Sequence, residues 1–284
     1  MLNSKLKFPT QRQKVSAFSL QPSAFARSGF TLVELLVVLS IMAIIAALAV
    51  PAFKNFGHAD AMTAADQQVL NDIARARQLA ISQRTTVYMV FVPTNFWTYP
   101  GYFPGTMTPA QKIAATNLCG FQLTGYTFVS LRAMGDQPGH GTTNYLAPWQ
   151  ALPDGTFFAQ QKFSLPGSQP FYVRAYNPAV PMYGFDTNAF PFPTPNSLSL
   201  LLPFIAFNYL GQLTTNGVDM AEAHEYILLA RGSVLPAMDP NTRTFQLSPP
   251  QVAEVPPGNS TNAYNLIDID PLTGRATLRE PKVQ

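Results

Sequence analysis

The stretch that decides the architecture is residues 30–53, which read FTLVELLVVLSIMAIIAALAVPAF. Glu34 is the only charged residue in this run. A helix of this length spans about 36 Å, which is enough to cross a hydrocarbon core of about 30 Å. Because backbone polar groups in lipid must be hydrogen-bonded internally, we expect residues 30–53 to form one membrane-spanning helix.

Positive charge is concentrated ahead of this run. The chain has 284 residues with 18 Lys+Arg against 15 Asp+Glu, a formal charge of +3. Residues 1–29 hold five of the basic residues and no acidic one, so they carry +5 and the remainder carries −2. The positive-inside rule then places residues 1–29 in the cytoplasm and the bulk of the chain outside, after a single crossing.

Composition excludes several kinds of site. The single cysteine, Cys119, rules out an intramolecular disulfide and a cysteine-based zinc site. His58, His140 and His224 are far apart and have no second ligand at metal spacing, so we expect no metal and no cofactor. Proline is abundant, at 26 residues, and lies mostly beyond residue 92, which favours short strands joined by loops.

Two ordinary explanations compete for the apolar run. One is a secretory signal peptide, with Ala47-Leu48-Ala49 as the cleavage site. The other is an uncleaved anchor. Neither explains Glu34, because a carboxylate inside a membrane helix costs roughly 2.5–3.5 kcal/mol and usually has a function.

The motif SGFTLVELL, residues 28–36, resembles the processing site of the type IV pilin and pseudopilin family. The resemblance implies cleavage after Gly29 by a prepilin peptidase and N-methylation of the new amino terminus on Phe30. It implies that Glu34 pairs with the amino-terminal charge of a neighbouring subunit, and that Pro51 marks a kink in the helix. It also implies an inner-membrane protein whose partners are other pilins, the peptidase/N-methyltransferase and an assembly platform.

Helical periodicity resumes beyond the membrane run. The apolar residues Val69, Ile73, Ala76 and Ala80 recur at helical spacing, which predicts an amphipathic continuation of the helix over residues 54–85. The β-branched and aromatic run TVYMVFV, residues 86–92, predicts a first strand. The segment ARARQLAISQRTTVYMVFV resembles the H-type minor pseudopilins of type II secretion, the GspH/FimT class.

The remainder, 86–284, is predicted to be a β-rich extracytoplasmic domain, so the expected class is α+β. Strands are predicted at 126–131, 156–158, 171–176, 197–210 and 225–234, with a closing hairpin over 264–279. That hairpin resembles the C-terminal sheet of the same class. Residues 93–196 are interpreted as a large insertion that either holds a partner site or decorates the sheet, and residues 177–196 as an irregular surface loop.

Other chemistry finds little support in the sequence. Asp268 and Asp270 do not continue into a calcium-loop pattern, and no phosphate loop or nucleophile elbow is present, so we expect no enzyme. Arg275 and Arg279 lie in a chain whose part after residue 29 carries −2, so nucleic acid is an unlikely partner. We expect a minor pilin or pseudopilin subunit. A membrane-anchored binding module and a DNA-uptake minor pilin are the alternatives.

Overall fold

The computed structural model describes residues 31–99, 102, 104–133, 135–137, 140–163, 171–172 and 181–279, with the backbone alone at 48–60, 171–172 and 181. The chain divides into two units, residues 1–51 and 52–284. Helix α1, Leu32–Gln83, begins in the first unit and ends in the second. The second unit contains the sheets.

All strand pairing in the described residues is antiparallel. The larger sheet has the order β10 (Leu213–Thr214), β9 (Ser199–Phe207), β1 (Val87–Phe91), β2 (Gly125–Ser130) and β3 (Asn144–Tyr145), with β8 (Asp186–Pro191) on β9 and β4 (Gln150–Ala151) on β2. The second sheet has the order β12 (Gln251–Glu254), β11 (Glu225–Leu235), β13 (Asn265–Ile269) and β14 (Ala276–Arg279), with β5 (Thr156–Phe158) on β11. The third is the pair β6 (Phe171–Tyr172) and β7 (Pro181–Met182).

Short helical segments connect these strands: α2 (Pro109–Asn117), α3 (Asn259–Asn262) and the 3-10 turns Phe96–Thr98, Pro104–Thr106, Leu118–Phe121 and Gln160–Phe163. A long helix followed by antiparallel sheets confirms the predicted α+β class.

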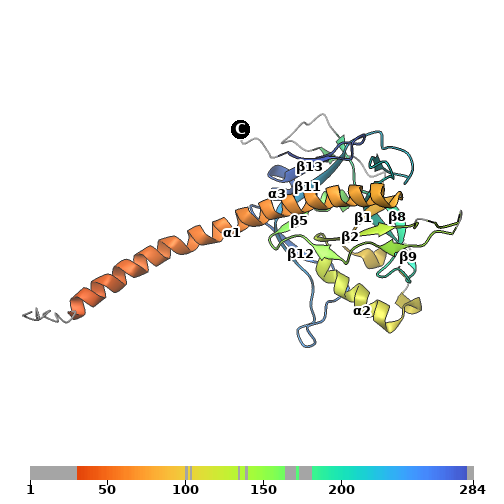
Figure 1. Ribbon diagram of the computed structural model, residues 1–284. Coiled ribbons are helices and arrows are strands. Elements are labelled where there is room, and N and C mark those ends of the chain that lie inside the picture. Colours follow the sequence, from red (N-terminus) through yellow and green to blue (C-terminus); the bar gives the residue numbers. More distant parts are fainter. Residues whose placement is uncertain are drawn as a thin grey trace, which may run out of the picture. The chain divides into compact units, whose positions relative to one another are not determined.

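The C-terminal part of α1 packs its apolar stripe against both larger sheets (Figure 1). Val69, Ile73, Ala76 and Ala80 are all fully buried, as the helical spacing predicted. They share one core cluster with Met89 and Phe91 of β1 and with Ile227 and Leu229 of β11, among others. This stripe therefore gives the two sheets a common hydrophobic core.

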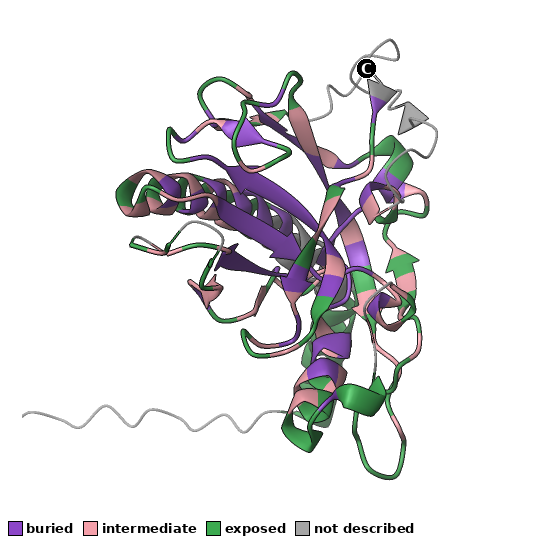
Figure 2. Ribbon diagram, turned by 90° about the vertical axis from the view of Figure 1, so that its right-hand side faces the viewer, coloured by how far each residue is buried: buried purple, intermediate pink, exposed green. Residues whose placement is uncertain are grey.

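Strand β1 is the centre of the larger sheet, and all five of its residues are buried. Figure 2 shows buried segments concentrated in the interior of the sheet domain. Val87, Met89 and Phe91 belong to the core under α1, whereas Tyr88 and Val90 belong to a second cluster. Because successive side chains of a strand point to opposite faces, one short run serves both cores. Other members of the second cluster come from α2 and the turn after it, and from β8 and β9.

The predicted closing hairpin is confirmed. Strands β13 and β14 pair in register from Leu266↔Arg279 to Ile269↔Ala276. Gly274 has a φ of +61° and donates its N–H to the carbonyl of Asp270 at 2.8 Å. A side chain at this position would collide with the carbonyl oxygen of Gly211, so glycine is required by close approach as well as by conformation.

The prediction of an irregular loop over 177–196 is wrong for residues 186–191, which form strand β8. Strand β8 pairs with β9 over six residues, and Phe190 and Phe192 are fully buried. Strand β8 is paired only on its β9 side among the described strands, which suits a segment that ends in proline. The segment 93–196 supplies β2 through β8, so it is part of both larger sheets.

Candidate functional site

The amino end of α1 is closed by two side chains that hydrogen-bond each other's backbone. The N–H of Glu34 donates to Thr31 Oγ1 at 3.2 Å. Glu34 Oε2 accepts from the Thr31 N–H and from the Thr31 hydroxyl, both at 3.4 Å. This reciprocal arrangement is a capping box. It holds the Glu34 carboxylate at the first helical turn, where the helix dipole favours negative charge.

The sequence analysis missed this role of Glu34. The signal was present, because Thr-x-x-Glu directly before an apolar run is the usual sequence signature of a capping box.

The turns around and after Glu34 expose apolar side chains on every face of the helix. Each of the following is between 44% and 80% exposed: Leu32, Val33, Leu35, Leu36, Val37, Val38, Leu39, Ile41, Met42, Ile44 and Ile45. The hydroxyl of Ser40 is satisfied inside the helix by the carbonyl of Val37 at 2.8 Å. A helix that is apolar all round is normally buried in a membrane or in a helix bundle.

Within the part of the chain that the structure describes, no helix is both long enough and apolar enough to cross a membrane.

The predicted processing residues, Gly29 and Phe30, lie outside the described residues. Pro51 lies inside α1, whose backbone continues to Gln83. Its assignment as a kink stays a prediction.

A buried ion pair ties the middle of the chain to strand β11. Lys162 is 1% exposed, and its Nζ lies 2.5 Å from Glu225 Oε1 and 2.8 Å from the carbonyl oxygen of Tyr183. The ammonium also lies 4.5 Å from the centre of the Phe185 ring. Burial raises the pKa of Glu225, and the charge of Lys162 acts against that rise. The pair is therefore a structural anchor, whose partners are too far apart in sequence for any motif to reveal.

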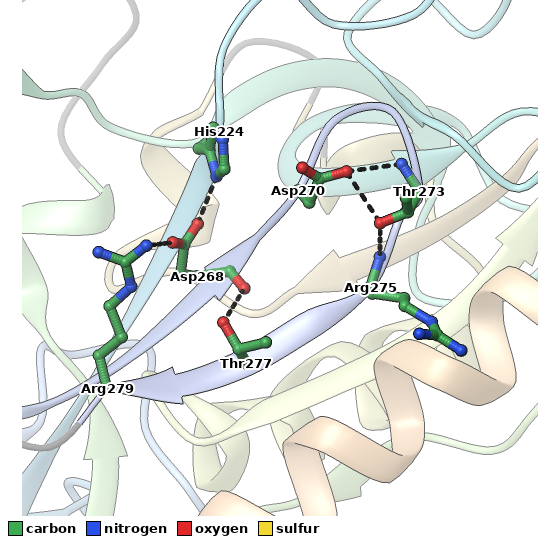
Figure 3. A network of polar contacts seen from close by, with 7 residues as sticks. All are labelled: His224, Asp268, Asp270, Thr273, Arg275, Thr277 and Arg279. Carbon is green, nitrogen blue, oxygen red and sulfur yellow. Dashed lines mark hydrogen bonds and ion pairs between the residues drawn. The ribbon is translucent and has the colours of Figure 1, made fainter.

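A second polar network joins β11, β13 and β14 (Figure 3). Asp268 is 3% exposed, its Oδ1 lies 2.7 Å from His224 Nδ1, and its Oδ2 is in an ion pair with Arg279. Asp270 instead accepts hydrogen bonds from the Thr273 N–H and hydroxyl at 2.7 and 2.8 Å. These bonds, the backbone one first, lower the pKa of Asp270.

This network bears on two ideas raised by the sequence. The carboxylates of Asp268 and Asp270 engage different partners, Asp268 within the sheet and Asp270 within its own turn. Arg279, which the DNA-uptake alternative would use, has its charge compensated by Asp268. Asp268, Asp270 and Arg279 thus have local structural roles.

Comparison with known proteins finds one match. Residues 25–50 match the family model described as the prokaryotic N-terminal methylation motif. This motif indicates a type IV pilin-like protein. It covers the end of the basic segment, the predicted cleavage site and the first turns of α1, including the capping box.

The motif indicates processing by a prepilin peptidase, implies filament assembly with other pilins, and indicates a membrane-anchored extracytoplasmic protein. No curated protein and no solved structure matches the chain.

Proposed function

We propose that the protein is a minor pilin or pseudopilin of the H-type (GspH/FimT) class, a structural subunit of a type II secretion or type IV pilus filament. The observation that carries the proposal is the methylation motif over residues 25–50. Cleavage falls between Gly29 and Phe30, and the new amine on Phe30 is methylated. The proposal assigns the chain no enzymatic reaction.

The proposed membrane placement follows from charge and apolarity. Residues 30–53 cross the inner membrane once, with the basic segment 1–29 cytoplasmic and the sheet domain extracytoplasmic. The apolar side chains exposed on α1 from Leu32 to Ile45 support this placement, because such a surface needs lipid or neighbouring helices around it. The processing enzyme and the assembly platform act on the chain at this membrane.

Glu34 has two roles in succession under this proposal. In the precursor its carboxylate closes the helix by bonding Thr31. After cleavage a positive amine lies one residue before Thr31, at the end of the helix where the dipole disfavours positive charge. In the filament Glu34 pairs with the amine of a neighbouring subunit, and this pair sets the register in a low-dielectric helix bundle.

The experiment is to compare incorporation of Glu34→Ala and Glu222→Ala proteins into sheared filaments. Glu222 is an exposed carboxylate of the sheet domain and serves as the matched control. We expect Glu34→Ala to be inserted into the membrane and cleaved but absent from filaments, and Glu222→Ala to enter normally. Normal entry of Glu34→Ala would remove the assembly role.

A further inference from the structure

A pocket of about 420 Å³ lies beyond the carboxyl end of α1. Its lining includes Arg84 and Arg132, the carboxylate residue Asp136, and the side chains of Tyr209 and Val218. It contains none of the residues of the methylation motif, so its function is a separate question from filament assembly.

Arg84 occupies a backbone conformation that normally selects glycine. It follows α1 with a φ of 49°, and its N–H and that of Thr85 bond the carbonyls of Ile81 and Ala80 at 3.4 and 3.2 Å. These bonds form the C-terminal motif in which glycine is usual, because a side chain strains the backbone in the left-handed region. A strained residue at a pocket is a reason to look for a function of its side chain.

Within the described residues neither Arg84 nor Arg132 takes part in an ion pair, although the charge of Arg132 interacts with that of Asp136 and, after the backbone hydrogen bonds, helps to lower the pKa of Asp136. The one lining carboxylate, Asp136, is already engaged. It accepts hydrogen bonds from the N–H groups of Ala133 and Thr142, both at 2.7 Å, and from the Thr142 hydroxyl at 3.0 Å. These bonds leave the Asp136 carboxylate charged, so the three charged lining residues sum to +1, and the pocket attracts an anion.

One rim of the pocket is apolar. Tyr209 and Val218 are 53% and 68% exposed, and the neighbouring Leu210 and Met220 are 57% and 43% exposed. The Asn208 side chain joins the two segments by donating to the carbonyl of Val218 at 3.3 Å. An anion-binding pocket with an adjoining apolar surface fits a ligand that carries a negative charge next to an apolar group.

We propose that this pocket is a docking site for an acidic and apolar peptide segment of a partner protein. A carboxylate of the partner is held by Arg84 and Arg132, and an adjacent apolar side chain packs on Tyr209 and Val218. Guanidinium groups suit this task because they bind carboxylates through paired N–H donors and stay charged. The apolar rim favours a peptide over a phosphate backbone. This site does not depend on the filament assignment.

The test is calorimetric titration of the full chain in detergent micelles with two probes, with blank titrations into empty micelles. One probe is an N-acetylated, C-amidated hexapeptide of alternating leucine and glutamate, and the other has glutamine in place of glutamate. We expect the glutamate peptide to bind at least about tenfold more tightly, because its carboxylates form charge-assisted hydrogen bonds with the guanidinium groups.

Three variants distinguish binding by the side chains of Arg84 and Arg132 from attraction to any positive charge on the protein. Arg84→Gly removes the strain and the guanidinium together, so it should weaken binding about tenfold while leaving the unfolding temperature equal or higher. Arg132→Gln should weaken binding similarly. Arg243→Gly is the matched control, because Arg243 is exposed, has a φ of 54° and lies outside the pocket. It should leave the affinity unchanged.

Equal affinity for the two hexapeptides would overturn the proposal, and so would full affinity in Arg84→Gly. Tighter binding of a glucuronate oligomer than of the glutamate peptide would overturn the peptide assignment in favour of an acidic sugar. Tighter binding of a random-sequence DNA duplex, weakened equally by Arg84→Gly and Arg243→Gly, would reduce the site to general attraction for phosphate.

Discussion

The first turns of α1 and the sheet domain differ in how far their apolar side chains are exposed and in how their charged side chains are paired. From Leu32 to Ile45 every large apolar side chain is at least 44% exposed, whereas Ile73 and Ala76 further along α1 are fully buried. Among the described residues Glu34 hydrogen-bonds its neighbour Thr31, whereas Glu225 forms an ion pair with Lys162 of a distant segment. Among the described residues, the sheet domain encloses the apolar stripe of α1 in its own core, whereas the first turns of α1 expose their apolar side chains.

The largest effect on stability is expected from breaking the ion pair between Lys162 and Glu225 in the sheet domain. Lys162→Met leaves Glu225, whose side chain is 24% exposed, without its cation, so we expect a loss of about 3 kcal/mol or slightly more in the free energy of unfolding. Chemical denaturation of the full chain in micelles measures it. The double variant Lys162→Met/Glu225→Leu should recover most of the loss, because two apolar groups need no partner. An unaltered midpoint in the single variant would show that the pair does not anchor β11.

A matched pair of isoleucines tests the apolar half of the comparison. Ile73→Ala removes packing from the shared core and should cost about 2–5 kcal/mol. Ile41→Ala removes the same atoms from a side chain that is 51% exposed, so the free energy of unfolding should change by less than about 0.5 kcal/mol. The same denaturation measurement applies to both. Equal losses would contradict the division of α1 into two kinds of surface.

The helix cap gives a smaller effect. Thr31→Val removes the hydroxyl that accepts the Glu34 N–H, which should destabilise the first turn by about 1 kcal/mol. Amide hydrogen exchange at residues 32–35 should become about fivefold faster, as that free energy requires. Thr31→Ser keeps the hydroxyl and should exchange as the wild type does. Unchanged exchange in Thr31→Val would mean that the capping box contributes nothing.

The smallest effect is a pH dependence at the turn between β13 and β14. The pKa of Asp270 is lowered by the Thr273 hydrogen bonds, so its ionised form stabilises the fold above its unfolded pKa near 3.8. That contribution is lost as the pH falls through the lower folded pKa. Asp270→Asn, which still accepts the bonds, should therefore show a smaller drop in unfolding temperature than wild type between about pH 5 and pH 2. An identical drop in unfolding temperature for the variant and the wild type would show that ionised Asp270 does not stabilise this turn.

Much of the fold could be predicted because its signals are local. The helical spacing of Val69 to Ala80 identified the buried stripe, and β-branched or aromatic runs and turn residues located β1, β5 and the closing hairpin. Strand β8 could not be predicted, since its proline-rich and aromatic surroundings resemble a loop and its order comes from pairing with β9. The link from Lys162 to Glu225 and the link from His224 to Asp268 likewise arise only when distant strands meet.

The candidate site around residues 28–36 differs from the sheet domain in how much of it could be predicted from the sequence. The residues of the motif predict a processing site between Gly29 and Phe30 and a role for Glu34 from sequence alone, and both stay predictions, whereas the match over residues 25–50 indicates a type IV pilin-like protein. The motif does not predict the hydrogen bonds between Glu34 and Thr31. It also does not predict the pocket that contains Arg84 and Arg132, because the lining of this pocket comes from four separate segments of the chain.

Mass spectrometry of the amino terminus of the mature protein, isolated from the membrane of its own host, tests the central claim most directly. The proposal predicts N-methylated Phe30 as the first residue. A mature chain that begins at Val50 would show cleavage by signal peptidase after Ala49. That result would contradict the pilin-like assignment, because α1 would have lost Glu34 and the exposed apolar turns around it.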